Sequence, residues 1–569
     1  MPSDDHFLTV DEAAGRLRVS VATVRRRCAS GDLSARKVGK SWLIEAAALP
    51  SPKVTTVRRR PGSASGQVDF PLALTHLKSQ DLKHDLWVPD VLRHEDDLAG
   101  PDVLFAAASA RLDLEEPFDP ANYVPVPKSP VFPRNAVDLS LVDRLAYQAV
   151  VNRCANAIEP RISTSVYSAH LSEDPRYFLM NGRDAWVRWK HDVVKAVHSV
   201  GPWMAETDIT AFFDFIKHEL LLPELQALSV DSTLISALRE MLRTWSVTPN
   251  TSLPQGPNAS RVLANFYMVP VDLALDAFPG VRYFRYMDDI RIVGQSRATV
   301  IAALQELDAE CRRRGLALST KKTELHRGSS AIRLMEDTDL DDLQYAFASG
   351  AGDEADLRQK LRNLFSSSVR PGDGIDIPRA RFSLGRLFRL RDNGVLRKAI
   401  MNLELLAPLR DIVPKYLHPW LRRPSVQRGL TKFLQDPERN TSKFLSTWLM
   451  AVMLDLEPPV PDEWVDYARG IACDRAQPTY HRAVALNVLS LSPHGRDLLR
   501  IEDVIRAEYD PEVVRAAVVA LARVGRLSKS VEVRARRVRG LASTAEYLRG
   551  RSDLPSLVFP SRRNMIRHH

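Results

Sequence analysis

Two adjacent aspartates, Asp288 and Asp289, stand at the centre of the segment 284–293, between two runs of aromatic and β-branched residues. Such runs are typical of paired strands, so the segment predicts a hairpin that presents two carboxylates at its tip. Adjacent carboxylates at a tight turn repel each other unless they share a cation, and Mg²⁺ prefers oxygen ligands. The pattern therefore indicates a divalent-metal site, with a solvated acidic hairpin as the alternative.

A third carboxylate, Asp208, lies where a predicted strand at 204–208 ends and a helix is expected to begin. An aspartate at such a junction can simply cap the helix. Carboxylates from two neighbouring strands can also hold two cations for phosphoryl transfer, one activating a 3′-hydroxyl and one holding a triphosphate. In that interpretation Asp208 and Asp288 bridge the two cations, and Asp289 supports them.

Four segments resemble the motifs of reverse transcriptases, in the order in which that family has them. Residues 204–216 are similar to its first carboxylate motif, and Tyr-Met-Asp-Asp at 286–289 is similar to its Tyr-x-Asp-Asp motif. The Pro-Gln-Gly segment with Gln255 and Gly256 resembles the motif that positions the incoming nucleotide and the template base; alone, it is an ordinary turn before a helix. Lys322 matches the lysine that approaches the triphosphate.

This resemblance implies an RNA-directed DNA polymerase that takes dNTPs and uses two Mg²⁺ ions, for which Mn²⁺ can substitute. The catalytic residues that it implies are Asp208, Asp288 and Asp289, and the metal-binding residues are Asp208, Ile209, Asp288 and Asp289. Phe213 occupies the position of the steric gate, where a bulky ring under the sugar disfavours a 2′-hydroxyl. Asp214 follows it, and viral RNA polymerases place an aspartate near there, so the sugar preference stays open.

Segments before Asp208 resemble the fingers of the same family. Residues 127–134 and 141–148 are similar to its basic hairpin and its Asp-Arg helix. Arg134 is the candidate ligand of the triphosphate, because a planar guanidinium can hold phosphate oxygens bidentately. A solvated surface arginine is the alternative.

Length and composition suit a large intracellular enzyme. The chain has 569 residues, 45% of them hydrophobic, which is enough for several domains with full cores. A net charge of +9 agrees with a nucleic-acid partner. The four cysteines are scattered, which predicts reduced thiols and no Cys-x-x-Cys zinc site. The start of the chain lacks a signal-peptide pattern and no apolar run is long enough to span a bilayer, so we expect a soluble, cytoplasmic protein without a membrane partner.

The first fifty residues form a separate unit. Residues 7–17 and 21–29 have apolar positions at helical spacing, with Thr9 and Glu12 as a capping box, and 33–44 predict a small β-hairpin. Residues 7–49 resemble the winged helix-turn-helix of excisionase and MerR-like proteins, which implies binding to duplex DNA. The candidate DNA-binding residues are Thr23, Arg25, Arg26, Arg27, Lys37 and Lys40. A fold kept for protein contacts or dimerisation is the alternative.

We therefore expect a multidomain α+β protein built around a right-hand polymerase core. The expected parts are a helix-turn-helix at 1–50, a linker and poorly defined segment at 51–90, fingers and palm at 91–330, and an all-α thumb or HEAT-like region at 331–569. The Ala-rich helix predicted at 510–525 resembles a HEAT-type repeat, although a thumb with an ordinary helical bundle agrees with the pattern equally well.

The order of these parts resembles bacterial abortive-infection and related defence reverse transcriptases. It favours an active polymerase used in anti-phage defence, with RNA or DNA as template or without a template. In that group a protein hydroxyl can act as primer, and the candidates in the C-terminal half are Tyr416, Tyr467, Tyr480, Tyr509 and Tyr547, each of which could instead be a core aromatic. A domesticated retroelement enzyme that copies a specific RNA is one alternative. A DNA-binding regulator on an inactive scaffold is another, against which the clustered aspartates argue. Homo-oligomerisation stays open.

Overall fold

A computed structural model describes most of the chain. The described residues are 63–559, except 85–86, 130–131, 350–352, 371–373, 457–458, 539, 550 and 552–553, together with 7–10, 13, 24, 28–29, 35–38 and 41–45. The protein is mixed α/β, and its contacts divide it into two compact units. One comprises Arg58–Asp90 and Pro101–Val452, and the other comprises Met1–Val57, Val91–Gly100 and Met453–His569.

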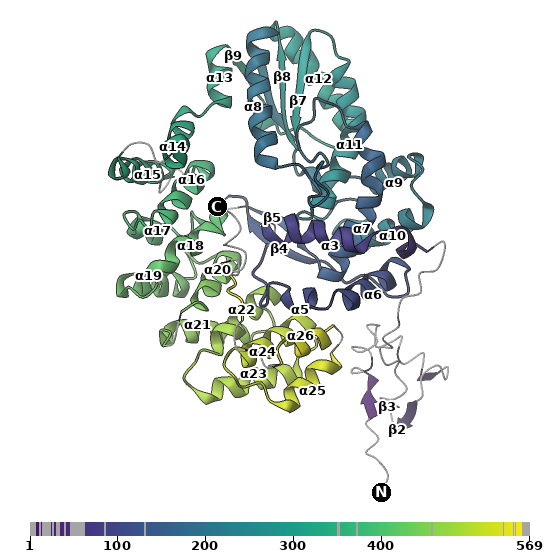
Figure 1. Ribbon diagram of the computed structural model, residues 1–569, viewed down its shortest axis with the longest axis vertical. Coiled ribbons are helices and arrows are strands. Elements are labelled where there is room, and N and C mark those ends of the chain that lie inside the picture. The colour runs from purple at the N-terminus through teal and green to yellow at the C-terminus, as the bar shows by residue number, and fades with distance from the viewer. Residues whose placement is uncertain are drawn as a thin grey trace. The chain divides into compact units, whose positions relative to one another are not determined.

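The first unit contains an antiparallel sheet of four strands in the order β7-β8-β6-β9, of which Figure 1 labels β7, β8 and β9 at the top of the view. The strands are β6 (Trp203–Asp208), β7 (Val281–Tyr286), β8 (Asp289–Gly294) and β9 (Glu324–Arg327). The register of β6 and β8 places Asp208 opposite Asp289. In the β7–β8 hairpin Tyr286 lies opposite Asp289, so two residues form the turn. The hairpin that the sequence predicts is present.

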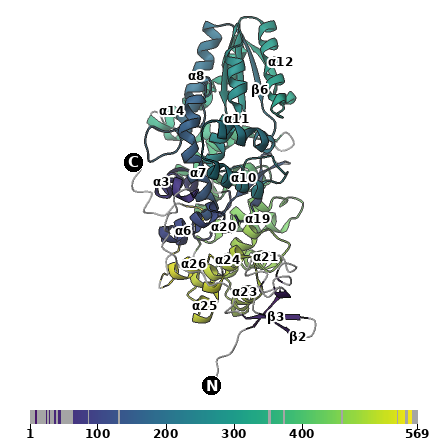
Figure 2. The ribbon, with the colours of Figure 1, turned by 90° about the vertical axis from the view of Figure 1, so that its right-hand side faces the viewer.

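Helices cover both faces of this sheet (Figure 2). Side chains alternate between the faces along a strand, so Met204, Phe284 and Val293 point to one face. They form a buried core there with residues of α8 (Gly182–Ser199) and α13 (Ser329–Met335). Helices α11 (Asn258–Asp276) and α12 (Arg297–Arg313) pack against the sheet as well, α12 on β6, β7 and β8. Strands buried on both sides give the end of the sheet a fixed geometry.

The remaining elements of this unit precede the sheet or follow it. A hairpin of β4 (Asn122–Pro127) and β5 (Pro133–Asp138) leads into the buried helix α7 (Leu141–Ile158). The other helices before β9 are α3 (Phe70–His76), α4 (Leu82–His84), α6 (Pro101–Leu112), α9 (His218–Ala227) and α10 (Ser232–Trp245). After α13 come α14 (Thr338–Ser349), α15 (Glu354–Ser368), α16 (Ile377–Arg389), α17 (Leu396–Met401), α18 (Ile412–Leu417), α19 (Pro424–Gln435) and α20 (Lys443–Met453), which crosses the boundary between the units.

The second unit holds the C-terminal helices. They are α21 (Asp462–Ala472), α22 (Thr479–Leu489), α23 (Gly495–Ala507), α24 (Pro511–Arg523), α25 (Lys529–Arg537) and α26 (Ala542–Tyr547), and α5 (Glu95–Leu98) packs against α26. Arg515 of α24 donates to both carboxylate oxygens of Asp96 at 2.8 and 2.7 Å, and this buried ion pair fixes the segment 91–100 among helices that lie more than 400 residues away in sequence. No helix in the described part of the chain is long and apolar enough to cross a membrane.

The same unit includes the N-terminal segment, where three strands form a sheet of order β1-β3-β2. β2 (Ala35–Val38) and β3 (Ser41–Glu45) form an antiparallel hairpin within the range predicted for one. Phe7–Thr9 forms the strand β1 and pairs with β3, and helical structure begins at Val10, directly after Thr9, the predicted N-cap.

Candidate active site

The two adjacent aspartates lie at the β7–β8 turn, which consists of Met287 and Asp288. Met287 has a φ of 60°, a left-handed conformation that is uncommon for a residue other than glycine. Its backbone N–H donates to Ser168 Oγ at 2.8 Å. The turn is therefore held in a strained conformation by the surrounding structure, as is common at functional sites.

A buried ion pair supports this turn. Arg285 Nε and Nη2 donate to the two carboxylate oxygens of Asp272 at 2.7 and 2.6 Å, and both side chains are 0% exposed. Arg285 Nη1 donates to the carbonyl of Met287 and to Asn265 Oδ1, both at 3.0 Å. The hydroxyl of Tyr283 donates to Asp272 as well. Burial raises the pKa of Asp272, and the charge of Arg285 opposes that rise. The guanidinium thus fixes the carbonyl of the strained residue.

Asp208 meets the turn through the backbone. The N–H of Ile209 donates to the carbonyl of Asp288 at 3.1 Å, and the N–H of Ser319 donates to the carbonyl of Asp208 at 2.8 Å. Because Asp208 also lies opposite Asp289 in the sheet, the three predicted catalytic aspartates converge at one end of β6 and β8. Asp208 is buried and the other two are half-buried, so all three carboxylates border one partly shielded space.

Lys322 reaches the same place from the short 3₁₀ helix Thr320–Lys322. Its Nζ donates to Asp208 Oδ2 at 2.6 Å, and the lysine side chain is 52% exposed. Burial lowers the pKa of Lys322, but the hydrogen bond to Asp208 and the nearby carboxylates outweigh it and raise the pKa. In this structure the lysine predicted to approach a triphosphate therefore supplies the positive charge that Asp208 faces.

The carboxylates at the turn hold their protons more tightly than ordinary aspartates. Burial, followed by the charges of Asp208 and Asp289, raises the pKa of Asp288 to about 6. Burial also raises the pKa of Asp289, against the opposing charge of Arg291. Both shifts have the same physical cause, which is negative charge gathered in a space with little water.

The chemistry of this cluster agrees with a divalent cation, although within the described residues no group of three or more His, Cys, Asp or Glu side chains stands close enough to hold a metal ion. Three carboxylates with one lysine leave an excess of negative charge. Asp288 and Asp289 receive no salt bridge within 4 Å in the described chain, whereas Asp208 pairs with Lys322. A hard cation with oxygen ligands would relieve the repulsion that raises the pKa of Asp288.

Phe213, the predicted steric gate, lies close to this end of β6 in a 3₁₀ turn, Phe212–Phe215. Ala211, just before the turn, has a φ of 47°. The carbonyl of Phe213 accepts a hydrogen bond from the N–H of Leu253 at 2.8 Å, which joins the gate to the Pro-Gln-Gly segment. The ring of Phe213 is half-buried, whereas Phe215 is exposed.

The Pro-Gln-Gly segment is anchored on both sides. The carbonyl of Gln255 accepts hydrogen bonds from the N–H of Val137 at 3.0 Å and from Trp87 Nε1 at 3.1 Å. Gly256 has a φ of 137°, and a Cβ there would lie 2.3 Å from Trp87 Nε1, so only glycine suits the position. The sequence predicted the glycine but not Trp87, whose segment carries no recognisable motif.

The β4–β5 hairpin carries two basic residues, Lys128 and the predicted triphosphate ligand Arg134. Burial raises the pKa of Asp288 and of Asp214, and the charge of Lys128, near the tip, opposes both rises. Arg134 lies exposed on β5, opposite Val126, and in the described part of the chain it makes no salt bridge to the three aspartates. Both residues are in the predicted basic hairpin, and only the three-dimensional turn could distinguish them.

The predicted DNA-binding residues fall mainly outside the described part of the chain, where Thr23, Arg25, Arg26, Arg27 and Lys40 lie. Lys37 is described; it is exposed on β2, with its Nζ 5.8 Å from the ring centroid of Trp42.

The predicted priming tyrosines differ in access to solvent. Tyr416 is fully buried in the unit that contains the aspartates, and burial raises its pKa. Tyr467, Tyr480, Tyr509 and Tyr547 belong to the other unit. Burial raises the pKa of Tyr480 to about 12, and Tyr547 is buried and donates to Glu95 Oε2. Tyr509 is 70% exposed.

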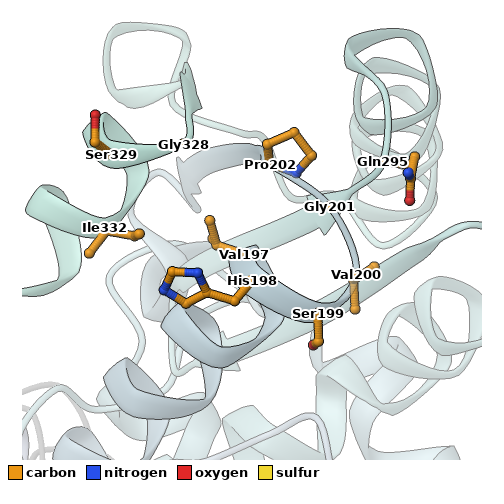
Figure 3. A pocket seen from close by; sticks show the side chains of 10 residues that line it. All are labelled: Val197, His198, Ser199, Val200, Gly201, Pro202, Gln295, Gly328, Ser329 and Ile332. Carbon is orange, nitrogen blue, oxygen red and sulfur yellow. The ribbon is translucent and has the colours of Figure 1, made fainter.

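A hollow of about 510 Å³ lies at the other end of the same sheet (Figure 3). It is lined by residues just before β6 and just after β8 and β9, including Pro202, Gln295 and Ser329, and by His198 at the end of α8. The strands are antiparallel, so these residues and the aspartates occupy opposite ends. The hollow contains no cluster of acids and is separate from the candidate active site.

Comparison with known families identifies two parts of the chain. Residues 140–344 match the family described as reverse transcriptase (RNA-dependent DNA polymerase), and residues 7–49 match a helix-turn-helix domain. Residues 140–344 are therefore a reverse transcriptase domain, that is, an RNA-directed DNA polymerase of the nucleotidyltransferase class. The match includes the three aspartates, Gln255 and Lys322. The match to residues 140–344 confirms the predicted class of enzyme, and enzymes of this class use divalent metal ions. The reverse transcriptase domain and the helix-turn-helix domain both indicate a nucleic-acid partner.

Solved structures with some similarity include two telomerases. One is from Candida albicans, in complex with a TWJ fragment of telomeric RNA, with 11% identity and a TM-score of 0.23 over 54% of this chain and 57% of that chain. The other is apo telomerase from Candida tropicalis, with 11% identity and a TM-score of 0.29 over 64% and 69% of the two chains. The chain thus spans a little over half the length of the first. A comparison with curated proteins finds no match.

Proposed function

We propose that the whole protein is an RNA-directed DNA polymerase that extends a 3′-hydroxyl with dNTPs. The observation that carries the proposal is the convergence of Asp208, Asp288 and Asp289 at one end of the sheet, within a reverse transcriptase domain. In the proposal these carboxylates, with the carbonyl of Ile209, hold two divalent cations, Mg²⁺ by preference. Such cations activate the attacking hydroxyl and neutralise the triphosphate.

The other residues of the site have roles that follow from their positions. Lys322 can leave Asp208 for a triphosphate oxygen, because its side chain is half exposed. Lys128 and Arg134, on the β4–β5 hairpin, supply further positive charge for the phosphates. The backbone at Gln255 and Gly256 borders the incoming base pair, and the ring of Phe213 excludes a 2′-hydroxyl. The segments before and after the domain act as fingers and thumb.

Primer extension tests this proposal directly. The purified chain is given an annealed DNA primer on an RNA or a DNA template, with dNTPs and with Mg²⁺, Mn²⁺ or EDTA. We expect incorporation with either metal, loss in EDTA, and loss in Asp208→Asn. Incorporation without a template would place the enzyme among template-independent polymerases. A wild-type protein inactive under all these conditions would contradict the proposal.

For the biological role we propose anti-phage defence, on the basis of a polymerase domain followed by many short helices, which resembles the abortive-infection group. Phage should form fewer plaques on cells that express the wild type than on cells that express Asp208→Asn at an equal protein level. Equal plaque numbers would contradict the role. Sequencing of the co-purified nucleic acid would then identify a domesticated enzyme, if one specific RNA and its copy dominate.

The helix-turn-helix is proposed to bind duplex DNA, with Lys37 and its neighbours at phosphates. Deletion of residues 1–50 should weaken binding to duplex DNA. It should also flatten the dependence of that binding on salt, because a protein with fewer phosphate contacts releases fewer counterions when it binds. Primer extension by the shortened chain should persist. Unchanged affinity for duplex DNA would favour a role in protein contacts or homo-oligomerisation.

If the enzyme primes from its own hydroxyl, Tyr509 is the best of the proposed tyrosines, because it is exposed. Protein from cells should then carry DNA that survives denaturing electrophoresis and is absent from Tyr509→Phe. DNA that persists in Tyr509→Phe would move the attachment to another residue, and protein free of DNA would exclude self-priming.

A further inference from the structure

Trp87 lies between the Pro-Gln-Gly loop and the helices that follow the polymerase domain. On one side its Nε1 donates to the carbonyl of Gln255 at 3.1 Å. On the other its carbonyl accepts a hydrogen bond from Trp448 Nε1 of α20 at 3.2 Å. The guanidinium of Arg410, just before α18, stacks over its ring at 4.4 Å from the centroid. All four residues belong to one compact unit, so a single buried residue connects the loop, through its side chain and its backbone carbonyl, with α20 and with the segment just before α18.

The contacts leave the loop little freedom. A carbonyl has two lone pairs, and that of Gln255 uses them for the N–H of Val137 and the indole of Trp87. The next residue, Gly256, has a φ of 137° and lies against the indole. The segment before Trp87 holds the other side of the loop, because the buried carboxylate of Asp81 accepts the N–H of Asn258 at the start of α11.

We propose that Trp87 is a positioning residue for the incoming nucleotide, and that Arg410 and Trp448 set its position. The inference deepens the proposed polymerase function and rests on it, because the loop matters only if it borders a nucleotide. Through Trp87, the helices beyond residue 400 determine the conformation of the nucleotide-binding loop. Any partner that displaces Arg410 or Trp448 then alters nucleotide binding without touching an aspartate.

Conservative variants separate positioning from folding. Trp87→Phe keeps an aromatic ring and removes the donor to Gln255, and Trp448→Phe removes the donor to the carbonyl of Trp87. Arg410→Gln removes the stacked charge. For Trp87→Phe we expect KM for dNTPs to rise roughly 5- to 10-fold, the effect of about one hydrogen bond, with kcat changed less than about 2-fold. We expect smaller rises in KM for Trp448→Phe and Arg410→Gln. In the double variant Trp87→Phe/Trp448→Phe, the effect on KM should be less than the sum of the two single effects, because both residues act on one loop.

A second arginine–tryptophan stack provides the matched control. Arg423 lies over Trp420 with 4.3 Å between the guanidinium carbon and the ring centroid, in the same helical region, and within the described residues neither side chain hydrogen-bonds to the loop. Trp420→Phe should leave KM unchanged. Trp87→Phe with unchanged KM would overturn the proposal, and so would a loss confined to melting temperature and kcat.

Hydrogen exchange distinguishes this proposal from the polymerase assignment itself. In wild type the amide of Val137 donates to Gln255, so its exchange reports the loop even in a protein that incorporates nothing. We expect faster exchange at Val137 in Trp87→Phe and not in Trp420→Phe. Unchanged exchange would overturn the inference about Trp87. Inactivity of the wild type, with exchange altered as expected, would contradict the proposed function alone.

Discussion

The two ends of the β7-β8-β6-β9 sheet are built from the same strands and differ in what they carry. At the aspartate end, three carboxylates converge and Met287 is held with a φ of 60°. At the other end, the backbone packs closely: a Cβ on Gly201 would lie 2.4 Å from Gln295 Cα and from the carbonyl oxygen of Gly294. One end therefore concentrates charge and strain, and the other brings backbone segments close together beside the hollow of about 510 Å³. The comparison predicts that changes at the far end affect stability alone, whereas changes at the aspartate end also affect catalysis.

The largest effect should come from the aspartate end. Asp288→Asn should lower dNTP incorporation by roughly 1,000-fold or more, because it removes a proposed ligand of both cations. Primer extension under single-turnover conditions measures this. Retention of full activity would place the chemistry elsewhere in the molecule.

In the absence of metal, Asp288→Asn should also be more stable than the wild type. No such gain in stability is expected from a variant at the opposite end of the sheet. The pKa of Asp288 is raised from 3.8 to about 6, so its ionisation opposes folding. The protonated carboxyl of Asp288 makes its full contribution to the stability of the wild type below about pH 4, and this contribution is lost as the pH rises through about 6. Asp288→Asn should therefore gain roughly 1–3 kcal/mol at pH 8 in EDTA and nothing at pH 4. Mg²⁺ should raise the melting temperature of wild type only.

A second prediction concerns the ion pair that supports the aspartate end. Asp272→Asn leaves the buried Arg285 without its counter-charge and should cost about 3–5 kcal/mol in unfolding free energy. It should also lower kcat of the folded fraction, because Arg285 holds the carbonyl of Met287. Asp96→Asn is the matched control, since it breaks the buried pair with Arg515 in the other unit. An equal loss of stability with equal kcat in both variants would make Asp272 a purely structural residue.

At the opposite end of the sheet, a substitution should lower stability and leave kcat nearly unchanged. In Gly201→Ala the new Cβ meets backbone atoms that no side-chain rotation can move, so we expect a loss of about 1–3 kcal/mol in unfolding free energy. Below the transition, kcat should stay within about 2-fold of wild type. Gly385→Ala, whose nearest atom would be Ile412 Cδ1 at 3.7 Å, should be neutral or slightly stabilising. A selective loss of kcat in Gly201→Ala would show that the two ends are coupled.

The sequence predicts the aspartate end well because its signals are local. Alternating strands, a polar turn and the spacing of Asp208, Gln255, Asp288 and Lys322 each lie within a short stretch. It does not predict Trp87, since an isolated tryptophan gives no pattern and its contacts lie 168 and 361 residues away. Nor does it select Lys128 over Arg134, because both lie on one basic hairpin. A charged Arg285 between apolar strand residues was a local signal for the buried pair, but its partner required the fold.

The smallest effect sharpens the comparison within the aspartate end itself. Phe213 and Phe215 lie two residues apart in the same 3₁₀ turn; Phe213 is half-buried and bonded through its carbonyl to Leu253, whereas Phe215 is 48% exposed. If the ring of Phe213 excludes a 2′-hydroxyl, Phe213→Ala should lower the preference for dNTPs over rNTPs roughly 10- to 100-fold, mainly through faster use of rNTPs. Phe215→Ala should leave that ratio unchanged, because an exposed ring has no fixed contact with a sugar. The ratio of kcat/KM for dCTP and rCTP on one template measures both. A wild type that already uses dCTP and rCTP equally would show that Phe213 does not act as a steric gate.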